Sequence, residues 1–303
     1  MAESDATSRP GAAAPARLAL MWTLQSQFAG YVLAREHELP ELEFVDRAAG
    51  RSPMLELLEG KAEYGVVSPA HILGARERSG EVVLVALFMA CSPVRMVGLR
   101  SRVGEDLKPR AGVRVGVWSG EDLELRAMLA LVGFDLAGVE FVPVGDEREA
   151  LLSGEVDYVQ ATTYNELPKI ISAAGAEEVV AHDPTRFNVD VAKDGLAVRR
   201  ELLEADPASV SRFVGGAVDG WRRTREDPAS AVAAVCRAAP GLVPAEEAIQ
   251  LQRLLELFDE DHELGRPREF DVERARRAAR AAGDPRADAL VRVDDGPWEQ
   301  ACV

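Results

Sequence analysis

Cysteine and histidine are scarce in this chain of 303 residues, which contains three cysteines and four histidines. The cysteines, Cys91, Cys236 and Cys302, are odd in number and far apart, so they predict neither a disulfide framework nor a zinc site. The histidines are equally scattered, and no Walker loop is present. A conventional hydrolase triad or a metalloenzyme centre is therefore not indicated.

Lysine is also rare, because most of the positive charge is arginine. Cofactor chemistry that needs a lysine is limited to Lys61, Lys108, Lys169 and Lys193. The formal net charge of −16 and the pI near 4.8 argue against a nucleic-acid partner and against attraction to anionic lipid.

Long apolar runs are missing as well, so no membrane insertion is predicted. The first 17 residues contain Ala, Ser, Pro and charged residues without the apolar core of a signal peptide. We expect residues 1–16 to be a disordered lead-in and the protein, as written, to be cytoplasmic. A chain trimmed of an export signal would look the same and would be periplasmic or extracellular.

What the sequence does have is a regular alternation of strand and helix patterns, which predicts an α/β fold with mostly parallel sheets. The alternation runs from about residue 17 to 100 and restarts near residue 112, and the chain becomes helical after about residue 199. The predicted strands are residues 18–21, 42–45, 64–67, 82–88, 94–99, 113–117, 139–142, 156–159 and 179–181. We expect lobe 1 at 17–100 plus 193–283, lobe 2 at 101–192, and a tail at 284–303.

The most informative stretch is the first strand and the aromatic, amide-rich segment that follows it. Residues 18–21 are apolar, Trp22 follows at the carboxyl end of this strand, and a helix is predicted to start near Gln27. Open α/β sheets bind their ligands in the crevice at such strand ends. Trp22 is therefore the first candidate for a ligand contact.

Several motifs resemble a known family. They are Trp22 with 27-QFAGY-31, 60-GKAEYG-65, 91-CSP-93, 116-GVW-118 and 156-VDYVQATTYNEL-167. Together they are similar to the type II periplasmic-binding-protein superfamily, in its thiamine-pyrimidine (SsuA-like) branch. This branch contains binding proteins for thiamine pyrimidine precursors and thiamine pyrimidine synthases. The resemblance covers about residues 18–260 and implies a two-lobed fold, with each sheet flanked by helices and a ligand cleft between the lobes.

The resemblance also implies a set of ligand contacts. Trp22, Tyr31 and Trp118 would stack on a pyrimidine ring, and the polar edge would come from Tyr164, Asn165 and Glu166. Ser68, His71, Ser92 and Gln160 complete the expected lining. For the aromatic residues, the alternative is an ordinary position in the core. For Glu166, it is a helix capping box with Thr163.

The loop 119–122 opens a predicted helix of lobe 2, where relatives line the cleft and some hold a phosphate. Here Glu121 and Asp122 supply negative charge at that helix start. Two carboxylates repel phosphate or sulfonate, so we expect a neutral or cationic ligand.

His71 separates two functions. In pyrimidine synthases a histidine at the matching place is consumed together with pyridoxal phosphate. Here Val67 stands where the pyridoxal-binding lysine would be, and Met21 replaces an asparagine. The alternative is that Ser68 caps a helix, Pro69 takes its first position, and His71 only lines the cleft.

The sequence thus predicts a substrate-binding protein for a small heteroaromatic ligand, resembling a thiamine pyrimidine precursor, without a cofactor and with an ABC-transporter permease as a possible partner. The alternative is a cytoplasmic synthase-like enzyme that uses His71, pyridoxal phosphate and iron in thiamine biosynthesis. A third class, an enzyme of menaquinone assembly on the same fold, has no motif here that we can name.

Overall fold

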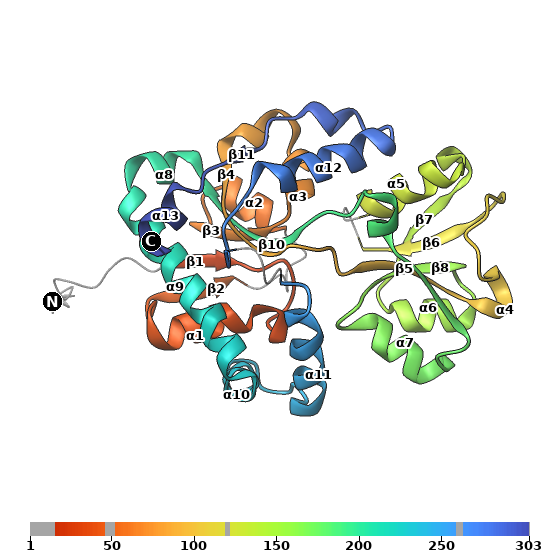
Figure 1. Ribbon diagram of the computed structural model, residues 1–303, viewed down its shortest axis with the longest axis horizontal. Coiled ribbons are helices and arrows are strands. Elements are labelled where there is room, and N and C mark those ends of the chain that lie inside the picture. The colour runs from red at the N-terminus through yellow and green to blue at the C-terminus, as the bar shows by residue number, and fades with distance from the viewer. Residues whose placement is uncertain (1–15, 46–51, 119–121, 259–262, 303) are drawn as a thin grey trace, which may run out of the picture.

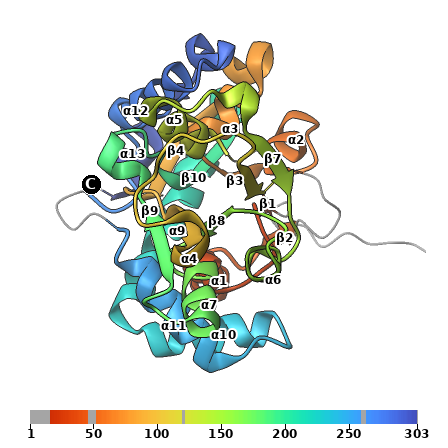
Figure 2. The ribbon, with the colours of Figure 1, turned by 90° about the vertical axis from the view of Figure 1, so that its right-hand side faces the viewer.

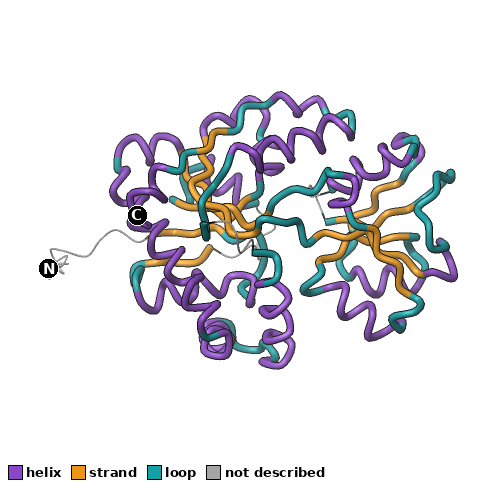
Figure 3. The backbone as a smooth tube through the Cα atoms, in the orientation of Figure 1, coloured by secondary structure: helices purple, strands orange, loops and turns teal. Residues whose placement is uncertain are grey.

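A computed structural model describes residues 16–45, 52–118, 122–258 and 263–302. Its strands form two separate sheets, one in each of two lobes that lie side by side along the longest axis (Figures 1 and 3). The two-lobed α/β architecture expected from the alternating pattern is present.

Lobe 1 contains a six-stranded sheet in the order β11-β4-β10-β3-β1-β2. Strand β1 pairs in parallel with β2 and β3, β11 pairs in parallel with β4, and β10 is antiparallel to both of its neighbours, β3 and β4. The strands are β1 (Ala16–Ala19), β2 (Leu42–Val45), β3 (Tyr64–Val67), β4 (Val82–Met89), β10 (Lys193–Arg199) and β11 (Arg292–Val293).

Lobe 2 contains a five-stranded sheet in the order β7-β6-β8-β5-β9. Strand β6 is parallel to β7 and β8, whereas β5 is antiparallel to β8 and β9. The strands are β5 (Val94–Leu99), β6 (Arg114–Val117), β7 (Glu140–Pro143), β8 (Tyr158–Thr162) and β9 (Val179–His182). In each sheet the antiparallel strand is the one that follows a crossover, because the chain then enters the sheet from the side of the other lobe.

Helices cover both sheets (Figure 1). In lobe 2, α5 lies on the same side as α12, and α6 and α7 lie on the other side of the sheet (Figure 2). Those of lobe 1 are α1 (Ala29–His37), α2 (Pro53–Leu58), α3 (Pro69–Gly74), α8 (Arg200–Ala205), α9 (Pro207–Glu226), α10 (Pro228–Ala238), α11 (Pro244–Leu255), α12 (Glu269–Ala281) and α13 (Gly296–Cys302). Those of lobe 2 are α4 (Arg100–Val103), α5 (Leu123–Val132), α6 (Glu147–Ser153) and α7 (Glu166–Ala174).

Short 3-10 turns link several of these elements: η1 (Ser26–Phe28), η3 (Arg76–Glu81), η4 (Leu136–Gly138), η5 (Pro184–Phe187) and η6 (Pro285–Asp288). The two helices α9 and α10 each start at an aspartate cap. Asp206 accepts the N–H of Ser209 before α9, and Asp227 accepts that of Ser230 before α10. Each cap is followed by a proline at the first helical position, where its missing N–H costs nothing.

Helices α1 and α9 pack at unusually close range through two glycines. A Cβ on Gly30 would lie 2.2 Å from the Trp221 ring, and one on Gly220 would lie 2.0 Å from the Gly30 carbonyl oxygen. Only glycine permits this approach, and Trp221 is completely buried, with its ring against Phe88 of β4.

The lobe boundaries differ from the prediction. Strand β5, expected at the end of lobe 1, pairs with β8 and β9 and so belongs to lobe 2. The first crossover is therefore residues 90–93, between β4 and β5. The apolar pattern identified β5 as a strand but not the sheet that contains it, because its pairing with β8 joins residues far apart in the chain.

The segment 284–303 was expected to be a tail, but its described residues, 284–302, are part of lobe 1. Strand β11 extends the sheet beside β4, and α13 packs on α9, with Trp298 buried. Helix α12 also departs from a simple two-lobe division, because it packs on both α3 of lobe 1 and α5 of lobe 2. One buried apolar cluster consequently runs from Ile72 through Ala275 to Met128.

Within the described ranges, no helix combines the length and the apolar character needed to cross a bilayer.

Candidate functional site

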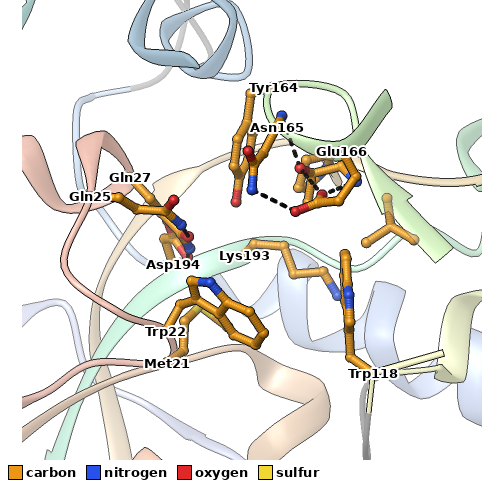
Figure 4. Close-up of a pocket in the computed structure, with 13 residues that line it drawn as sticks. Met21, Trp22, Gln25, Gln27, Trp118, Tyr164, Asn165, Glu166, Lys193 and Asp194 are labelled. Atoms are coloured by element: carbon orange, nitrogen blue, oxygen red, sulfur yellow. Dashed lines mark hydrogen bonds between the residues drawn. The ribbon is translucent and has the colours of Figure 1, made fainter. Parts of the chain in front are cut away.

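A hollow lies between the two lobes at the ends of their strands, with an empty volume of about 560 Å³ that includes its opening to solvent (Figure 4). We call it the first hollow. Lobe 1 contributes Met21, Trp22, Gln25, Gln27, and Lys193 and Asp194 at the start of β10. Lobe 2 with the first crossover contributes Pro93, Val94, Trp118, Thr162, Tyr164, Asn165 and Glu166. The site joins elements that are up to 173 positions apart in the chain (from Met21 to Asp194).

The two tryptophans come from opposite lobes. Trp22 follows β1 and Trp118 follows β6, so each stands at the carboxyl end of a parallel strand, as expected for this sheet type. Trp22 is 40% exposed, which is unusual for so large an apolar side chain. Both indole rings border the first hollow and offer flat apolar surfaces to it (Figure 4).

The ring of Trp118 is held by a carboxylate that the sequence reasoning missed. Its Nε1 donates to Glu147 Oε1 at 2.5 Å, and its backbone N–H donates to Gln160 Oε1 at 3.2 Å. Burial raises the pKa of Glu147 above its ordinary value, and the nearby carboxylates of Glu166 and Asp146 add to this effect. Glu147 opens α6, and no local motif connects it with Trp118.

The polar wall of lobe 2 is formed by the residues after β8. Tyr164 is buried and lines the first hollow. Asn165 Nδ2 donates to Glu166 Oε1 at 2.6 Å, and Lys169 Nζ donates to Asn165 Oδ1 at 2.7 Å. These bonds fix the orientation of the Asn165 amide.

Glu166 is committed mainly to its own backbone. Its Oε2 accepts the backbone N–H of Thr162 at 2.8 Å and the Thr162 hydroxyl at 2.6 Å. The expected box with Thr163 is not formed, because the turn closes one residue earlier, with the Asn165 N–H donating to Thr162 Oγ1. Glu166 therefore lines the hollow, but both of its oxygens already accept hydrogen bonds.

Lys193 and Asp194 lie between the lobes and line the first hollow, and neither was predicted from the sequence as a ligand contact. Both are almost fully buried. Lys193 Nζ lies 2.7 Å from Glu124 Oε2 of α5, and Asp194 accepts from Gln27 Nε2 at 3.0 and 3.2 Å on its two oxygens. In the sequence they stand at the return into lobe 1, and Lys193 is one of only four lysines, but neither feature indicates a place in the ligand cleft.

Tyr31, predicted to stack on the ligand, lies in the core instead. It is completely buried on α1 and packs edge-on against Phe88 and Trp221, with ring centroids 5.9 and 6.2 Å away. Burial raises the pKa of the Tyr31 phenol well above its ordinary value. Helix α1 turns this face toward the sheet, so the alternative reading of a core aromatic applies to Tyr31 and also to Phe28.

Ser68, Ser92 and Gln160 are fully buried and do not line the first hollow. Ser68 Oγ accepts the N–H of His71 as the cap of α3, and Ser92 Oγ accepts the N–H of Val94. Gln160 holds the Trp118 backbone. All three therefore support the strand ends from behind rather than facing a ligand.

His71 lines a different hollow, which we call the second hollow. Its other lining residues are Ser52, Pro53, Met54, Leu55, Leu58, Ala70, Leu73, Gly74, Ala75, Asp122, Leu123, Ala279, Asp284 and Arg286. His71 Nδ1 accepts the Ser68 N–H at 3.0 Å, so its ring completes a reciprocal capping box at the start of α3. The first and second hollows share no lining residue.

The expected loop 119–122 lies mostly outside the described residues, which resume at Asp122. The Asp122 carboxylate accepts from Arg126 Nε at 2.6 Å. Over the ranges that the structure covers, no group of three or more His, Cys, Asp or Glu side chains is placed to hold a metal ion.

A pyridoxal cofactor fits the described residues poorly. A synthase would need its donor histidine and its lysine in one site, yet His71 lines the second hollow and Lys193 the first. The Lys193 ammonium is moreover paired with Glu124, and Val67, where the resemblance would place the cofactor lysine, is a buried valine.

Comparisons with known proteins agree with this architecture. The family model described as "NMT1/THI5 like" matches residues 28–231, and no curated protein sequence matches significantly. Among solved structures, the ligand-binding component of an ABC-type import system from Staphylococcus aureus, with zinc bound, has a TM-score of 0.72 at 10% identity, over 95% of this chain and 99% of that one.

Two further structures show the same fold. The periplasmic aliphatic sulphonate-binding protein SsuA from Escherichia coli has a TM-score of 0.66 at 17% identity, over 90% of this chain and 86% of that one. The periplasmic nitrate-binding protein NrtA from Synechocystis PCC 6803 has a TM-score of 0.67 at 11% identity, over 95% and 88%. The predicted type II binding-protein fold is confirmed.

Proposed function

Because this chain belongs to the NMT1/THI5-like family and has the type II periplasmic-binding-protein fold, we propose that it is a substrate-binding protein for a small heteroaromatic ligand. The observation that carries the proposal is the first hollow, where Trp22 of lobe 1 and Trp118 of lobe 2 border the same space. The finer proposal is a thiamine pyrimidine precursor, as the sequence motifs suggest.

Aromatic walls and polar edges suit such a ligand. A pyrimidine ring is flat and apolar on its faces, and it carries hydrogen-bonding groups only around its rim. The indoles supply the faces, whereas Asn165, Gln25 and Asp194 bring acceptors and donors to the rim. Since the walls belong to different lobes, a small hinge movement would tighten them on the ring.

The charge of the first hollow supports a neutral or cationic ligand over an anionic one. Its charged lining residues are Glu166, Lys193 and Asp194, and Lys193 is paired with Glu124 of α5. No arginine is among the described residues that line it. The anions named in the descriptions of SsuA and NrtA are therefore poor guides to this site.

Relatives of this fold are described as parts of ABC import systems and as periplasmic proteins. We accordingly extend the proposal to delivery of the ligand to an ABC-transporter permease from an exported location. The expectation of a cytoplasmic protein finds no support among these relatives.

Native mass spectrometry of the purified protein, followed by calorimetric titration with a 4-aminopyrimidine, tests the ligand class. In the mass spectrum we expect one ligand bound per chain. In the titration we expect the 4-aminopyrimidine to bind and the natural ligand to compete with it, whereas an alkanesulfonate and nitrate should not bind. Tight binding of the sulfonate with none of the pyrimidine would refute the proposed ligand class.

We also propose that binding needs no pyridoxal phosphate. Protein mixed with the cofactor and reduced with borohydride should give no pyridoxyl-lysine on peptide mapping, because Lys193 is buried against Glu124. A pyridoxyl group on Lys193, or a change of mass at His71 after incubation with pyridoxal phosphate, iron and oxygen, would instead favour a synthase.

A further inference from the structure

Helix α11 has no residue among those that line the first hollow, but it packs on η1, the turn that follows the segment with Trp22. Two polar residues on the inward face of α11 are almost fully buried, Glu247 at 6% and Gln250 at 4% exposed. Such a face normally buries apolar side chains, as α11 does with Leu251 and Leu254. A buried carboxylate and a buried amide are costly without hydrogen-bond partners, so their partners indicate what they do.

Glu247 holds the backbone of the segment that contains Trp22. Its Oε2 accepts the Ser26 N–H at 2.7 Å in a buried environment, and a carboxylate that accepts a backbone N–H makes one of the stronger hydrogen bonds in a protein. At the other end of the segment, the Leu20 N–H donates to the Val45 carbonyl at 3.0 Å. Trp22 therefore stands on a short irregular segment that is fixed to the sheet at one end and to α11 at the other.

Gln250 begins a chain of side-chain amides that reaches the first hollow (Figure 4). Its Nε2 donates to Gln25 Oε1 at 3.1 Å, and Gln25 Nε2 donates to Gln27 Oε1 at 3.3 Å. Gln27 Nε2 then donates to the two Asp194 oxygens at 3.0 and 3.2 Å. The Asp194 carboxylate sets this direction, because it offers acceptors to the Gln27 NH₂ group and each amide then turns its oxygen to the next one.

We propose that Glu247 and Gln250 are positioning residues for the first hollow. From outside it, they fix the segment of residues 21–27, so that Trp22 is held in place as a wall. Glu247 has the larger part, because it holds the backbone, whereas Gln250 holds one side chain. The consequence for binding rests on the proposed function, but the placement of the segment does not.

The placement is tested without a ligand, by hydrogen exchange at the Ser26 amide. Glu247→Met keeps the length of the side chain and removes its oxygens, so the Ser26 amide should exchange about tenfold faster than in the wild type. Glu247→Gln keeps an acceptor and should restore slow exchange. Glu246→Leu is the matched control, because Glu246 lies in the same first turn of α11 but is exposed. Unchanged exchange in Glu247→Met would overturn the role of Glu247.

The effect on binding is tested by a double-mutant cycle with Trp22→Ala, in calorimetric titrations with 4-aminopyrimidine. Glu247→Met should weaken binding about five- to tenfold in the wild type, and Glu247→Gln should recover the affinity. In the Trp22→Ala background, Glu247→Met should have little further effect, because it acts through Trp22. A residue that only stabilised lobe 1 would change the urea unfolding curve without this coupling. Additive losses would therefore overturn the proposal.

Gln250→Met tests the second residue and leaves the carboxylate in place. It should weaken binding of the same probe about two- to threefold, since the Gln25 amide loses its donor. Gln252→Met, on the exposed face of α11, is the matched control and should bind as the wild type does. Equal affinities of these two variants would overturn the role of Gln250.

These outcomes separate the two proposals. If the wild type does not bind 4-aminopyrimidine, the proposed ligand class is refuted, and hydrogen exchange at Ser26 still decides whether Glu247 positions the segment. If the wild type binds it and the cycle is additive, this inference fails and the proposed function stands.

Discussion

The first and second hollows both lie where residues of the two lobes meet, but their walls are built differently. The first hollow has Trp22 and Trp118 as flat walls. In the second, polar side chains are paired with each other: Asp284 accepts from Arg286, and Asp122 from Arg126. The first hollow thus offers flat aromatic surfaces that a ligand can cover, whereas no Trp, Tyr or Phe is among the described residues that line the second.

The contrast between Trp22 and His71 shows why position at a strand end is not sufficient for a ligand contact. Both follow a strand of the lobe 1 sheet, β1 and β3. Trp22 projects from a segment without regular structure, while His71 lies in the first turn of α3 and caps it. When a helix starts directly after a strand, its first backbone N–H groups lack partners within the helix. The polar side chains beside them, here Ser68 and His71, then serve as caps and are less available to a ligand.

The largest expected effect comes from removing a wall of the first hollow. Trp22→Ala should weaken binding of an aminopyrimidine by about 1–3 kcal/mol, through loss of a desolvated aromatic contact. Titration calorimetry measures it, and Trp22→Phe should recover part of the loss. Full affinity in a folded Trp22→Ala protein would contradict the proposal that the ligand binds against Trp22 in the first hollow.

A smaller effect is expected at Glu147, which positions Trp118 without lining the hollow. Glu147→Leu removes the acceptor of the indole N–H and should weaken binding by about 1 kcal/mol, the net value of one such bond. Glu147→Gln keeps an acceptor and should bind as the wild type does. If both variants lose the same affinity, the hydrogen bond to Trp118 is not the cause.

The raised pKa of Glu147 gives a prediction for stability. A carboxyl group with a raised pKa in the folded state holds its proton more tightly there than in the unfolded chain. Its contribution is favourable below the ordinary value of 4.5 and is lost as pH rises through the raised pKa. Glu147→Gln cannot ionise, so its stability relative to wild type should increase across this window in urea unfolding curves. A constant difference would contradict the shift.

The smallest effect on binding is expected in the second hollow. His71→Ala should leave the affinity for an aminopyrimidine unchanged and should reduce the free energy of unfolding by about 1 kcal/mol, through loss of one capping hydrogen bond. Ser68→Ala is the matched variant, because it removes the other half of the same capping box. A large loss of affinity in His71→Ala alone would mean that the second hollow also takes part in binding.

Local patterns predicted much of the fold. Strands β2, β3 and β5 begin and end where the apolar runs do, because a half-buried or buried strand needs only its own side-chain pattern to be recognised. The starts of α9 and α10 follow from an aspartate cap and a proline. Trp22, Trp118 and the three residues after Thr163 were selected from motifs and do line one hollow.

Tertiary structure decided what these patterns leave open. The sheet to which β5 belongs, the docking of α13 on α9 and the burial of Tyr31 against Trp221 all depend on partners far away in the chain. Tyr31, like Trp22, was selected from a motif that resembles the ligand contacts of the family. The close contact of Gly30 with α9 turns α1 so that Tyr31 faces the core.

The same holds for two charged residues of the site. In the sequence, Lys193 and Asp194 are two adjacent charged residues before a glycine, with no motif that indicates a ligand contact. Only the fold sets Asp194 at a positive φ, pairs Lys193 with Glu124 of the other lobe and brings both beside the tryptophans. Residue type and spacing determined which elements form, because those depend on neighbours within a few residues. Which side chains meet in the first hollow was decided by the tertiary structure, because it depends on how the two sheets are placed relative to each other.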